Sequence, residues 1–184
     1  ADITSDSSGM LYGLRSYDVS SSANGNNNLF GEAGNDKLVG GTGNDTLDGG
    51  KGSDTITTGS GSDTIVLRSD DGGDALSDAD KVTDFTDGSD VLGLADGLKY
   101  TELTIAQGTN SHSNDTVISI TLTSEVLAIL QSVDASSVNY LDFASTATGS
   151  QSFTGTAGDD VFIGAAGIDT VTTSTGTDVI LTSS

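Results

Sequence analysis

Apolar residues recur at a fixed spacing in the first third of the chain, and glycine-rich segments separate them. The apolar positions are Leu29, Leu38, Leu47, Ile56 and Ile65. Each is the middle residue of a three-residue segment, and in an extended segment the middle side chain points to the opposite face from its neighbours. The six residues before each segment contain glycines, which allow the positive φ angles of tight turns. The pattern therefore predicts a series of short strands, each with one inward side chain.

The repeating unit is clearest in residues 40–48 and 49–57. These read Gly-Gly-Thr-Gly-Asn-Asp-Thr-Leu-Asp and Gly-Gly-Lys-Gly-Ser-Asp-Thr-Ile-Thr. Units 22–30, 31–39 and 58–66 keep the glycine at the fourth position and the apolar residue at the eighth. Residues 13–21 keep only Gly13 and Asp18, which we interpret as a cap on the array.

A second block of units occupies residues 146–181 in its own register. Its apolar positions are Phe153, Phe162, Val171 and Ile180. Its acidic positions are Asp160, Asp169 and Asp178, with Gln151 in the first unit. The second glycine of every unit is lost, being replaced by Ala147, Thr156, Ala165 and Ser174. This block is therefore a degenerate version of the first.

The unit geometry stacks acidic side chains on one another. One unit forms one edge of a flattened coil and two units form a full turn, so equivalent residues two units apart lie about 4.8 Å apart. The stacked pairs are Asp36 over Asp54, Asp45 over Asp63, Asn27 over Asp45, and Asp160 over Asp178. Bare carboxylates at this distance repel each other. A hard cation with six or more oxygen ligands, Ca²⁺, fits such a site better than Mg²⁺ or Zn²⁺.

These units resemble the Gly-Gly-x-Gly-x-Asp-x-aliphatic-x nonapeptides of RTX (repeats-in-toxin) proteins. The match is specific over residues 31–66 and looser over 13–30 and 146–181. The resemblance implies an all-β fold, a right-handed parallel β-roll that binds calcium. It also implies that one turn provides the carbonyls of its first and third positions, and the turn above those of its second and fourth.

Carried over to this chain, the resemblance implies three calcium sites in the first roll. In the first site, Gly31, Ala33 and Asp36 face Gly50, Gly52 and Asp54. In the second, Gly40, Thr42 and Asp45 face Gly59, Gly61 and Asp63. In a weaker third, Ser22, Asn24 and Asn27 face Gly41, Gly43 and Asp45, because Asn27 brings no charge. Asp160 and Asp178 are the candidates in the second roll, where the lost glycines weaken the expectation.

Residues 67–145 interrupt the period and divide the chain into three expected parts. These are a cap and first roll (1–66), a β-rich middle segment (67–145), and a second, short, degenerate roll with a secretion-signal-like tail (146–184). The stretch 80–94 resembles the segment that follows the roll in secreted RTX proteins, and predicts two strands joined by a turn at Gly88. Asp84 and Asp90 in this stretch are candidates for a further calcium site, or equally for caps of a polar turn.

The rest of the middle segment is expected to be β-structure packed like a sandwich on the roll. Residues 103–106 and 116–122 have the composition and alternation of strands. Residues 124–131 fit either a helix capped by Ser124 or the return arm of a hairpin, and their closeness to the preceding strand favours the hairpin. The whole segment 80–143 resembles one found in secreted cyanobacterial RTX proteins.

Charge narrows the range of partners. The chain has 27 acidic and 6 basic residues, a formal net charge of −21. This balance argues against nucleic acid and against anionic membrane surfaces as partners. Disorder, the usual alternative for an acidic chain, is disfavoured because the acids stand singly at regular spacing. The chain has no cysteine and no apolar stretch of membrane-spanning length, so neither disulfides nor membrane insertion are expected.

No sequence motif for catalysis is present. The chain lacks the zinc-protease motif His-Glu-x-x-His and the nucleophile motif Gly-x-Ser-x-Gly, and we expect its single histidine, His112, to lie exposed in a loop. We therefore expect no enzyme, but a secreted calcium-binding module that folds on calcium after passing the type I export machinery. The alternatives are a surface-layer or adhesin segment that self-associates on a cell surface, and an accessory module of a secreted polysaccharide-modifying enzyme. The first residues lack the features of a signal peptide, so either a signal was removed, export follows a route without one, or the chain is a fragment, and we favour the last two.

Overall fold

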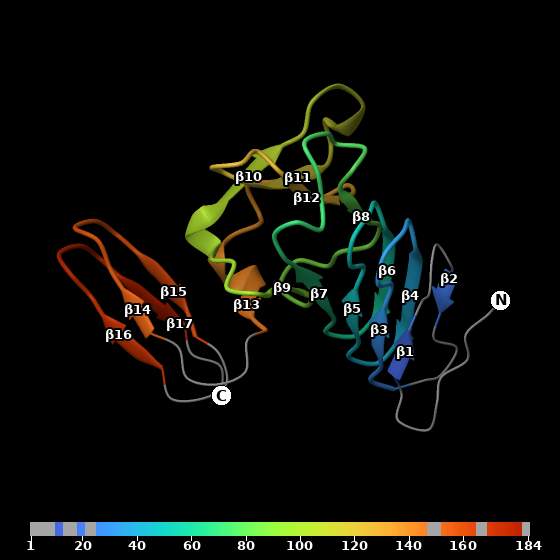
Figure 1. The fold of residues 1–184 in the computed structure, drawn as a ribbon, viewed down its shortest axis with the longest axis horizontal. Coiled ribbons are helices and arrows are strands. Elements are labelled where there is room, and N and C mark those ends of the chain that lie inside the picture. Colours follow the sequence, from blue (N-terminus) through green and yellow to red (C-terminus); the bar gives the residue numbers. More distant parts are fainter. Residues whose placement is uncertain (1–9, 13–17, 21–24, 147–151, 165–168, 182–184) are drawn as a thin grey trace.

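The computed structural model describes residues 10–12, 18–20, 25–146, 152–164 and 169–181, and most of its secondary-structure elements are short strands (Figure 1). A six-stranded sheet contains, in spatial order, β1 (Met10–Tyr12), β3 (Asn28–Phe30), β5 (Thr46–Asp48), β7 (Thr64–Leu67), β9 (Val91–Leu94) and β13 (Phe143–Ser145). A seven-stranded sheet contains β10 (Leu103–Gln107), β11 (Thr116–Ile120), β12 (Val126–Leu130), β8 (Asp80–Val82), β6 (Thr55–Ser60), β4 (Lys37–Thr42) and β2 (Asp18–Ser20).

Successive repeat units alternate between the two sheets, which confirms the predicted parallel β-roll. Strands β3, β5 and β7 pair in parallel in one sheet, and β4 pairs in parallel with β6 in the other. The pairing register joins Leu29 to Leu47 and Leu47 to Ile65, each two units further along the chain. We call the part of the structure from β3 to β7 the first roll.

The interior of the first roll consists of two stacks of aliphatic side chains, one on each sheet. The stack on the six-stranded sheet contains Leu29, Leu47, Ile65 and Leu92; the stack on the seven-stranded sheet contains Leu38, Ile56, Val82 and Leu130. Each of these side chains is fully buried. Both stacks run from the repeats into the non-repeat strands, so the middle segment extends the same core.

The middle segment continues both sheets and adds an antiparallel hairpin. Strands β8 and β9 follow the roll in parallel, on either side of a turn in which Gly88 has a φ of 72°. Strand β11 pairs antiparallel with both β10 and β12, so the hairpin interpretation of residues 124–131 is confirmed. Ser124 lies in the tight turn before β12 with a φ of 65°, a conformation that a helix N-cap does not have. Three single-turn 3₁₀ helices complete the segment: η1 (Tyr100–Glu102), η2 (Asn110–His112) and η3 (Tyr140–Asp142).

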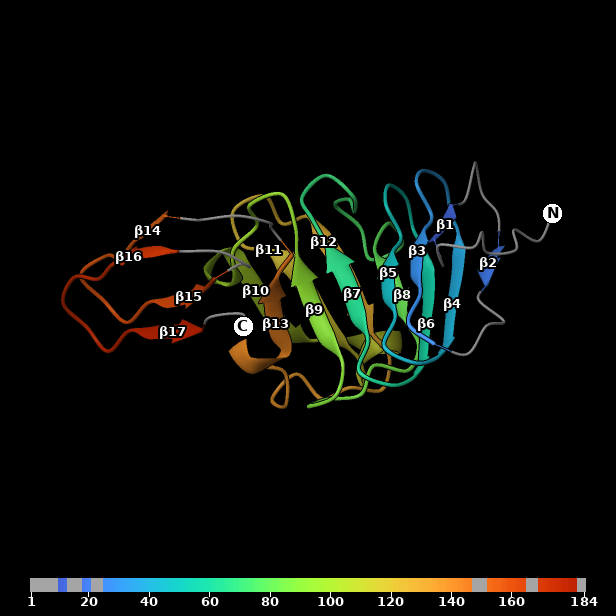
Figure 2. The same ribbon diagram turned by 90° about the horizontal axis from the view of Figure 1, so that it is seen from below.

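The second roll forms a separate pair of two-stranded parallel sheets beside the middle segment (Figure 2). One sheet pairs β14 (Ser152–Thr154) with β16 (Thr170–Thr172), and the other pairs β15 (Val161–Ile163) with β17 (Val179–Leu181). Phe153 and Phe162 pack with ring centroids 5.6 Å apart, whereas Ile180 is 48% exposed. This roll therefore has the same coil as the first but a thinner core. Within the residues described, no helix has the length and apolar character needed to span a membrane.

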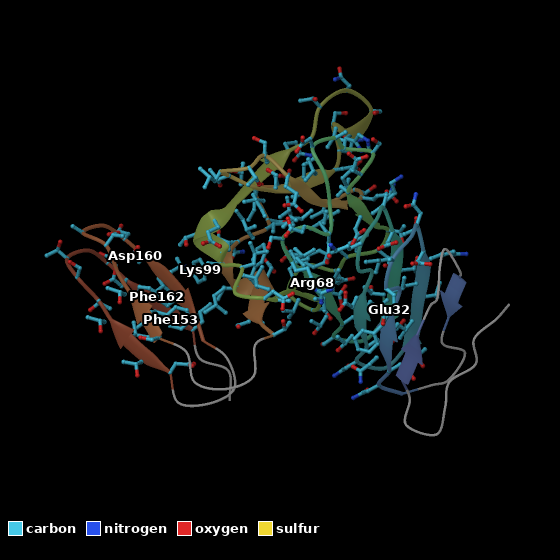
Figure 3. The ribbon with its side chains drawn as sticks, viewed as in Figure 1. Glu32, Arg68, Lys99, Phe153, Asp160 and Phe162 are labelled. Carbon is cyan, nitrogen blue, oxygen red and sulfur yellow. The ribbon has the colours of Figure 1, made fainter. Side chains whose placement is uncertain are left out.

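Glu32, labelled in Figure 3, occupies a turn position that glycine holds in the three units that follow it. Its φ is 74°, in the left-handed region, and Gly50 stands at the equivalent place one coil above with a φ of 82°. Residues with a Cβ lose roughly 1–2 kcal/mol in this region. The first roll therefore contains local strain where the glycine pattern is broken.

Replacing Glu32 with glycine should relieve this strain. We expect Glu32→Gly to raise the free energy of unfolding by about 1 kcal/mol, measured by urea denaturation at saturating calcium.

The opposite change at the equivalent position serves as the control. A Cβ at Gly50 would overlap the carbonyl of Glu32, so Gly50→Ala should destabilise the fold. A loss of stability in Glu32→Gly would show that its side chain contributes more than its backbone strain costs.

Candidate metal centre

Two stacks of polar side chains line the turns of the first roll, one beside each sheet. We call these two stacks the inner ladders. Their members are the sixth residues of the units, and they are almost fully buried. In one ladder, the backbone N–H of Asp36 donates to Oδ1 of Asp54 over 2.7 Å. In the other, the N–H of Asp45 donates to Oδ1 of Asp63 over 2.7 Å. The structure thus brings together the two carboxylate pairs that the sequence predicted.

Three of these carboxylates have a second oxygen without a hydrogen-bond partner among the described residues. In the part of the chain that the structure describes, Oδ2 of Asp45, Asp54 and Asp63 is buried with no hydrogen-bond partner. All three residues are 1% exposed. Leaving a buried charged acceptor unsatisfied costs more than the roughly 1–3 kcal/mol of a neutral group. A cation beside these oxygens would remove that cost, so the residues present fit the predicted calcium ion.

Asn27 shows how a neutral side chain fills the same place. Its amide Nδ2 donates to the carbonyl of Gly25 over 2.6 Å and to Oδ1 of Asp45 over 3.1 Å. The amide thus bridges a turn carbonyl and a carboxylate without an ion, and the weaker calcium site expected here stays a prediction. Ser22 and Asn24, predicted to add carbonyls to this site, lie outside the described residues.

A second set of contacts, on the outside of the turns, was not anticipated from the sequence. The side-chain Oδ1 of Asn26 accepts from the N–H of Asn44 over 2.8 Å, and Oδ1 of Asn44 accepts from the N–H of Ser62 over 3.1 Å. These residues stand at the fifth position of the unit, next to the acidic one. The recurrence of a small polar residue at this position in every unit of residues 22–66 is the sequence signal that could have predicted these contacts. Side-chain hydrogen bonds therefore connect the stacked turns on both their inner and their outer face.

The turn backbones approach one another too closely for side chains. A Cβ at Gly61 would overlap the carbonyl of Gly43, and a Cβ at Gly52 would overlap that of Gly34. The predicted carbonyl ligands lie on these stacked turns: Gly31, Ala33, Gly40, Gly41, Thr42, Gly43, Gly50, Gly52, Gly59 and Gly61. Nowhere among the described residues do three or more acidic, histidine or cysteine side chains form a metal site by themselves. An ion bound there would need other oxygens in addition, such as those of the backbone or of water.

Asp84 and Asp90 are fully engaged by hydrogen-bond donors. Asp84 accepts from the N–H of Thr58 over 2.8 Å with one oxygen and from that of Gly59 over 3.0 Å with the other. Asp90 accepts from the N–H of Asp63 over 3.1 Å and from that of Thr86 over 2.8 Å. Both carboxylates cap turns in this structure, and calcium binding by them stays a prediction. Asp90 is also the last member of the ladder that contains Asp45 and Asp63.

The second roll repeats the ladder with altered surroundings. The N–H of Asp160 donates to Oδ1 of Asp178 over 3.1 Å, as predicted from the spacing. Asp160, however, also accepts from both the N–H and the hydroxyl group of Thr156, over 2.8 and 3.2 Å. Thr156 stands at the second position of its unit, where three units of the first roll have glycine. The lost glycine therefore does more than restrict the backbone, because its replacement donates to the carboxylate that a cation would need.

Two basic side chains lie close to carboxylates elsewhere. Arg68 makes a bidentate ion pair with Asp48 over 2.6 and 2.9 Å and also pairs with Asp71 over 3.4 Å (Figure 3). His112, which we expected to be exposed, is partly buried, with Nδ1 2.8 Å from Oδ2 of Asp115. Asp115 also accepts from the N–H of Ser132 over 2.9 Å, so this pair fastens the hairpin to the following turn.

Burial raises the pKa of two ladder carboxylates, Asp54 and Asp63. Desolvation raises the pKa of Asp54 to about 6 from 3.8, and the nearby charge of Asp36 adds to the effect. Desolvation also raises the pKa of Asp63, helped by the charges of Asp90 and Asp45. Without a cation, the folded state therefore holds protons that the unfolded chain would release.

The raised pKa values predict that acid partly replaces calcium. A group with a raised folded-state pKa favours folding more as the pH falls, from about 6 toward 3.8 for Asp54. In buffer freed of calcium by a chelating resin, lowering the pH from 7 to 4.5 should increase the β-sheet signal in circular dichroism. At saturating calcium the same change should weaken the fold, because protons and calcium compete for the carboxylates. A calcium-free β signal that fell over this range would contradict the assignment of buried, ion-free carboxylates.

Comparison with known proteins agrees with this geometry. The family model described as the RTX calcium-binding nonapeptide repeat matches four times, over residues 21–56, 30–65, 39–74 and 148–184. A search of curated proteins finds no match. Solution structures of the AlgE6R3 and AlgE6R2 subunits of the Azotobacter vinelandii mannuronan C5-epimerase are similar with TM-scores of 0.49. AlgE6R3 is 22% identical to this chain, and the match covers 74% of this chain and 79% of AlgE6R3. AlgE6R2 is 23% identical, and the match covers 78% of this chain and 91% of AlgE6R2. The chain carries the repeat in both of its rolls and belongs to the RTX calcium-binding repeat proteins.

Proposed function

We propose that this chain is an extracellular module whose folding is switched on by calcium and whose role is structural and not catalytic. The observation that carries the proposal is the set of buried, unpartnered carboxylate oxygens on Asp45, Asp54 and Asp63. A fold with such oxygens in its centre is unfavourable in calcium-free solution and becomes favourable when the ion is present. The repeats of this family are structural calcium-binding motifs, which agrees with this role.

The proposed ligands are those implied by the repeat. Each ion takes one carboxylate from each of two stacked turns, Asp36 with Asp54 and Asp45 with Asp63, and the turn carbonyls supply the other oxygens. Ca²⁺ binds six to eight oxygens at 2.3–2.6 Å in flexible geometry, and stacked turns with two carboxylates and several carbonyls meet that need. Asp160 and Asp178 form a weaker site, since Thr156 already donates to Asp160.

Calcium-dependent folding suits export through a narrow channel. A chain with net charge −21 repels itself and stays unfolded where calcium is scarce. Sites of the extracellular type have dissociation constants of about 10⁻⁴–10⁻³ M, so they would fill outside the cell and not inside. We propose type I secretion as the route, with folding on the outside.

Removing calcium should abolish most of the β-structure. We expect the circular dichroism spectrum in a chelator at pH 7.5 to be that of a largely unfolded chain, and calcium at millimolar concentration to restore the β signal cooperatively. Magnesium at the same concentration is the control, and should fail because it demands six ligands in near-ideal octahedral geometry. A chelated chain that keeps its full β signal would disprove the folding switch.

A single ladder carboxylate should control calcium affinity. We expect Asp45→Asn to raise the calcium concentration at the folding midpoint at least about tenfold, because charge-assisted contacts are worth roughly 1.5–3 kcal/mol. The matched variant Asp160→Asn should shift the midpoint less, since Asp160 has donors of its own. Equal shifts in the two variants would refute the assignment of the principal sites to the first roll.

The same fold could serve in two other settings. A surface-layer or adhesin segment would use calcium to associate with copies of itself, and sedimentation at saturating calcium would then show assemblies where the folding module stays monomeric. An accessory module of a polysaccharide-modifying enzyme would need a surface for the polymer. A groove between the middle segment and the second roll is lined by Tyr100, Phe153 and Phe162 together with Lys99 (Figure 3). This groove is the place where such binding would be sought.

A further inference from the structure

One inner ladder continues beyond the repeats, into a residue that the nonapeptide period does not reach. The N–H of Asp54 donates to Oδ1 of Asp80 over 2.8 Å, as that of Asp36 donates to Oδ1 of Asp54 over 2.7 Å. The spacing from Asp54 to Asp80 is 26 residues, whereas each repeat step of the ladder is 18. Asp80 therefore occupies the sixth position of a coil whose turn has been replaced by a longer loop.

The backbone around Asp80 copies that of the repeats. The N–H of Lys81 donates to the carbonyl of Asp54 over 2.8 Å, just as the N–H of Thr55 donates to the carbonyl of Asp36 over 2.8 Å. Strand β8 then pairs in parallel with β6, joining Ile56 to Val82. The stacking geometry that places two carboxylates one above the other in the repeats is thus retained here.

The two ladders end differently. Asp90 closes its ladder with both oxygens accepting from N–H groups, of Asp63 and Thr86. At the end of the other ladder, Asp80 is 5% exposed and its carboxyl group accepts from the N–H of Asp54. Oδ2 of Asp54 is buried there without a hydrogen-bond partner. A buried carboxylate oxygen that has no donor and lies next to a second buried carboxyl group needs either a proton or a cation.

We propose that Asp54 and Asp80 bind a calcium ion at the junction between the first roll and the middle segment, a site outside the nonapeptide repeats. This inference rests on the proposed calcium-dependent folding of the roll. The other oxygens would come from backbone carbonyls of the turn that precedes Asp54 and from water. Asp80 begins β8, which pairs in parallel with β12 through Asp80 and Ala128. An ion at this place therefore links the calcium state of the roll to the hairpin.

The test counts calcium ions bound to the full chain at saturation, by equilibrium dialysis followed by metal analysis. We expect Asp80→Asn to bind one ion fewer than the unmodified chain. Asp74→Asn is the matched control: Asp74 is an exposed residue of the same loop, and its replacement should leave the count unchanged. Asparagine keeps the acceptor for the N–H of Asp54, and its amide can donate to a carboxylate as Asn27 does to Asp45.

Each outcome distinguishes the explanations. If Asp54 and Asp80 only share a proton, Asp80→Asn mimics the protonated acid and folds with an unchanged calcium count, which overturns the proposal. If Asp80→Asn does not fold in calcium, Asp80→Glu decides: folding with the full count supports the site, and failure of both variants assigns Asp80 a packing role instead. An unmodified chain that binds no calcium would refute the proposed function itself, whereas an unchanged count in Asp80→Asn refutes only this additional site.

Discussion

The structure depends on the stacking of buried carboxylates in the turns of the roll. Asp36 with Asp54, and Asp45 with Asp63, lie one coil apart and are almost completely shielded from water. Backbone N–H groups satisfy one oxygen of Asp54 and Asp63, but the other oxygen has no protein partner. An arrangement of this kind is unfavourable without a cation. This arrangement supports the proposal that the fold depends on the calcium ion that its family binds.

The two rolls show which features of the turn make that dependence strong. In the first roll, glycines let the turn backbones come into contact, so that only carbonyls and carboxylates remain around the ion position. In the second roll, Thr156 replaces a glycine and donates to Asp160 from both its backbone and its hydroxyl group. Asn27 provides a neutral solution within the first roll, because its amide bridges Gly25 and Asp45. At these two turns a side-chain donor therefore lies next to the carboxylate, which is the basis for proposing weaker calcium sites there.

The aliphatic core and the carboxylate ladders both continue past the repeats, so the first roll and the non-repeat middle segment form one continuous structure. The aliphatic stacks continue from the repeats through Val82 and Leu92 without a break. The carboxylate ladders also continue, to Asp80 on one side and Asp90 on the other, although the chain between them no longer repeats. Sheet pairing therefore places these carboxylates, and the length of the connecting loop is free to vary.

The sequence alone determined the roll, its strands and the carboxylate pairs of the repeats, because a strict nonapeptide period dictates both which residues are extended and which lie one coil apart. The same reasoning predicted the strand–turn–strand around Gly88 and favoured the hairpin that ends in β12. The period could not reveal Asp80 as the next member of a ladder, since an insertion places it 26 residues after Asp54. Nor could it show that donors surround Asp84, Asp90 and Asp160, or that His112 bonds to Asp115. Those contacts join residues through sheet pairing and turn geometry, which only the tertiary structure decides.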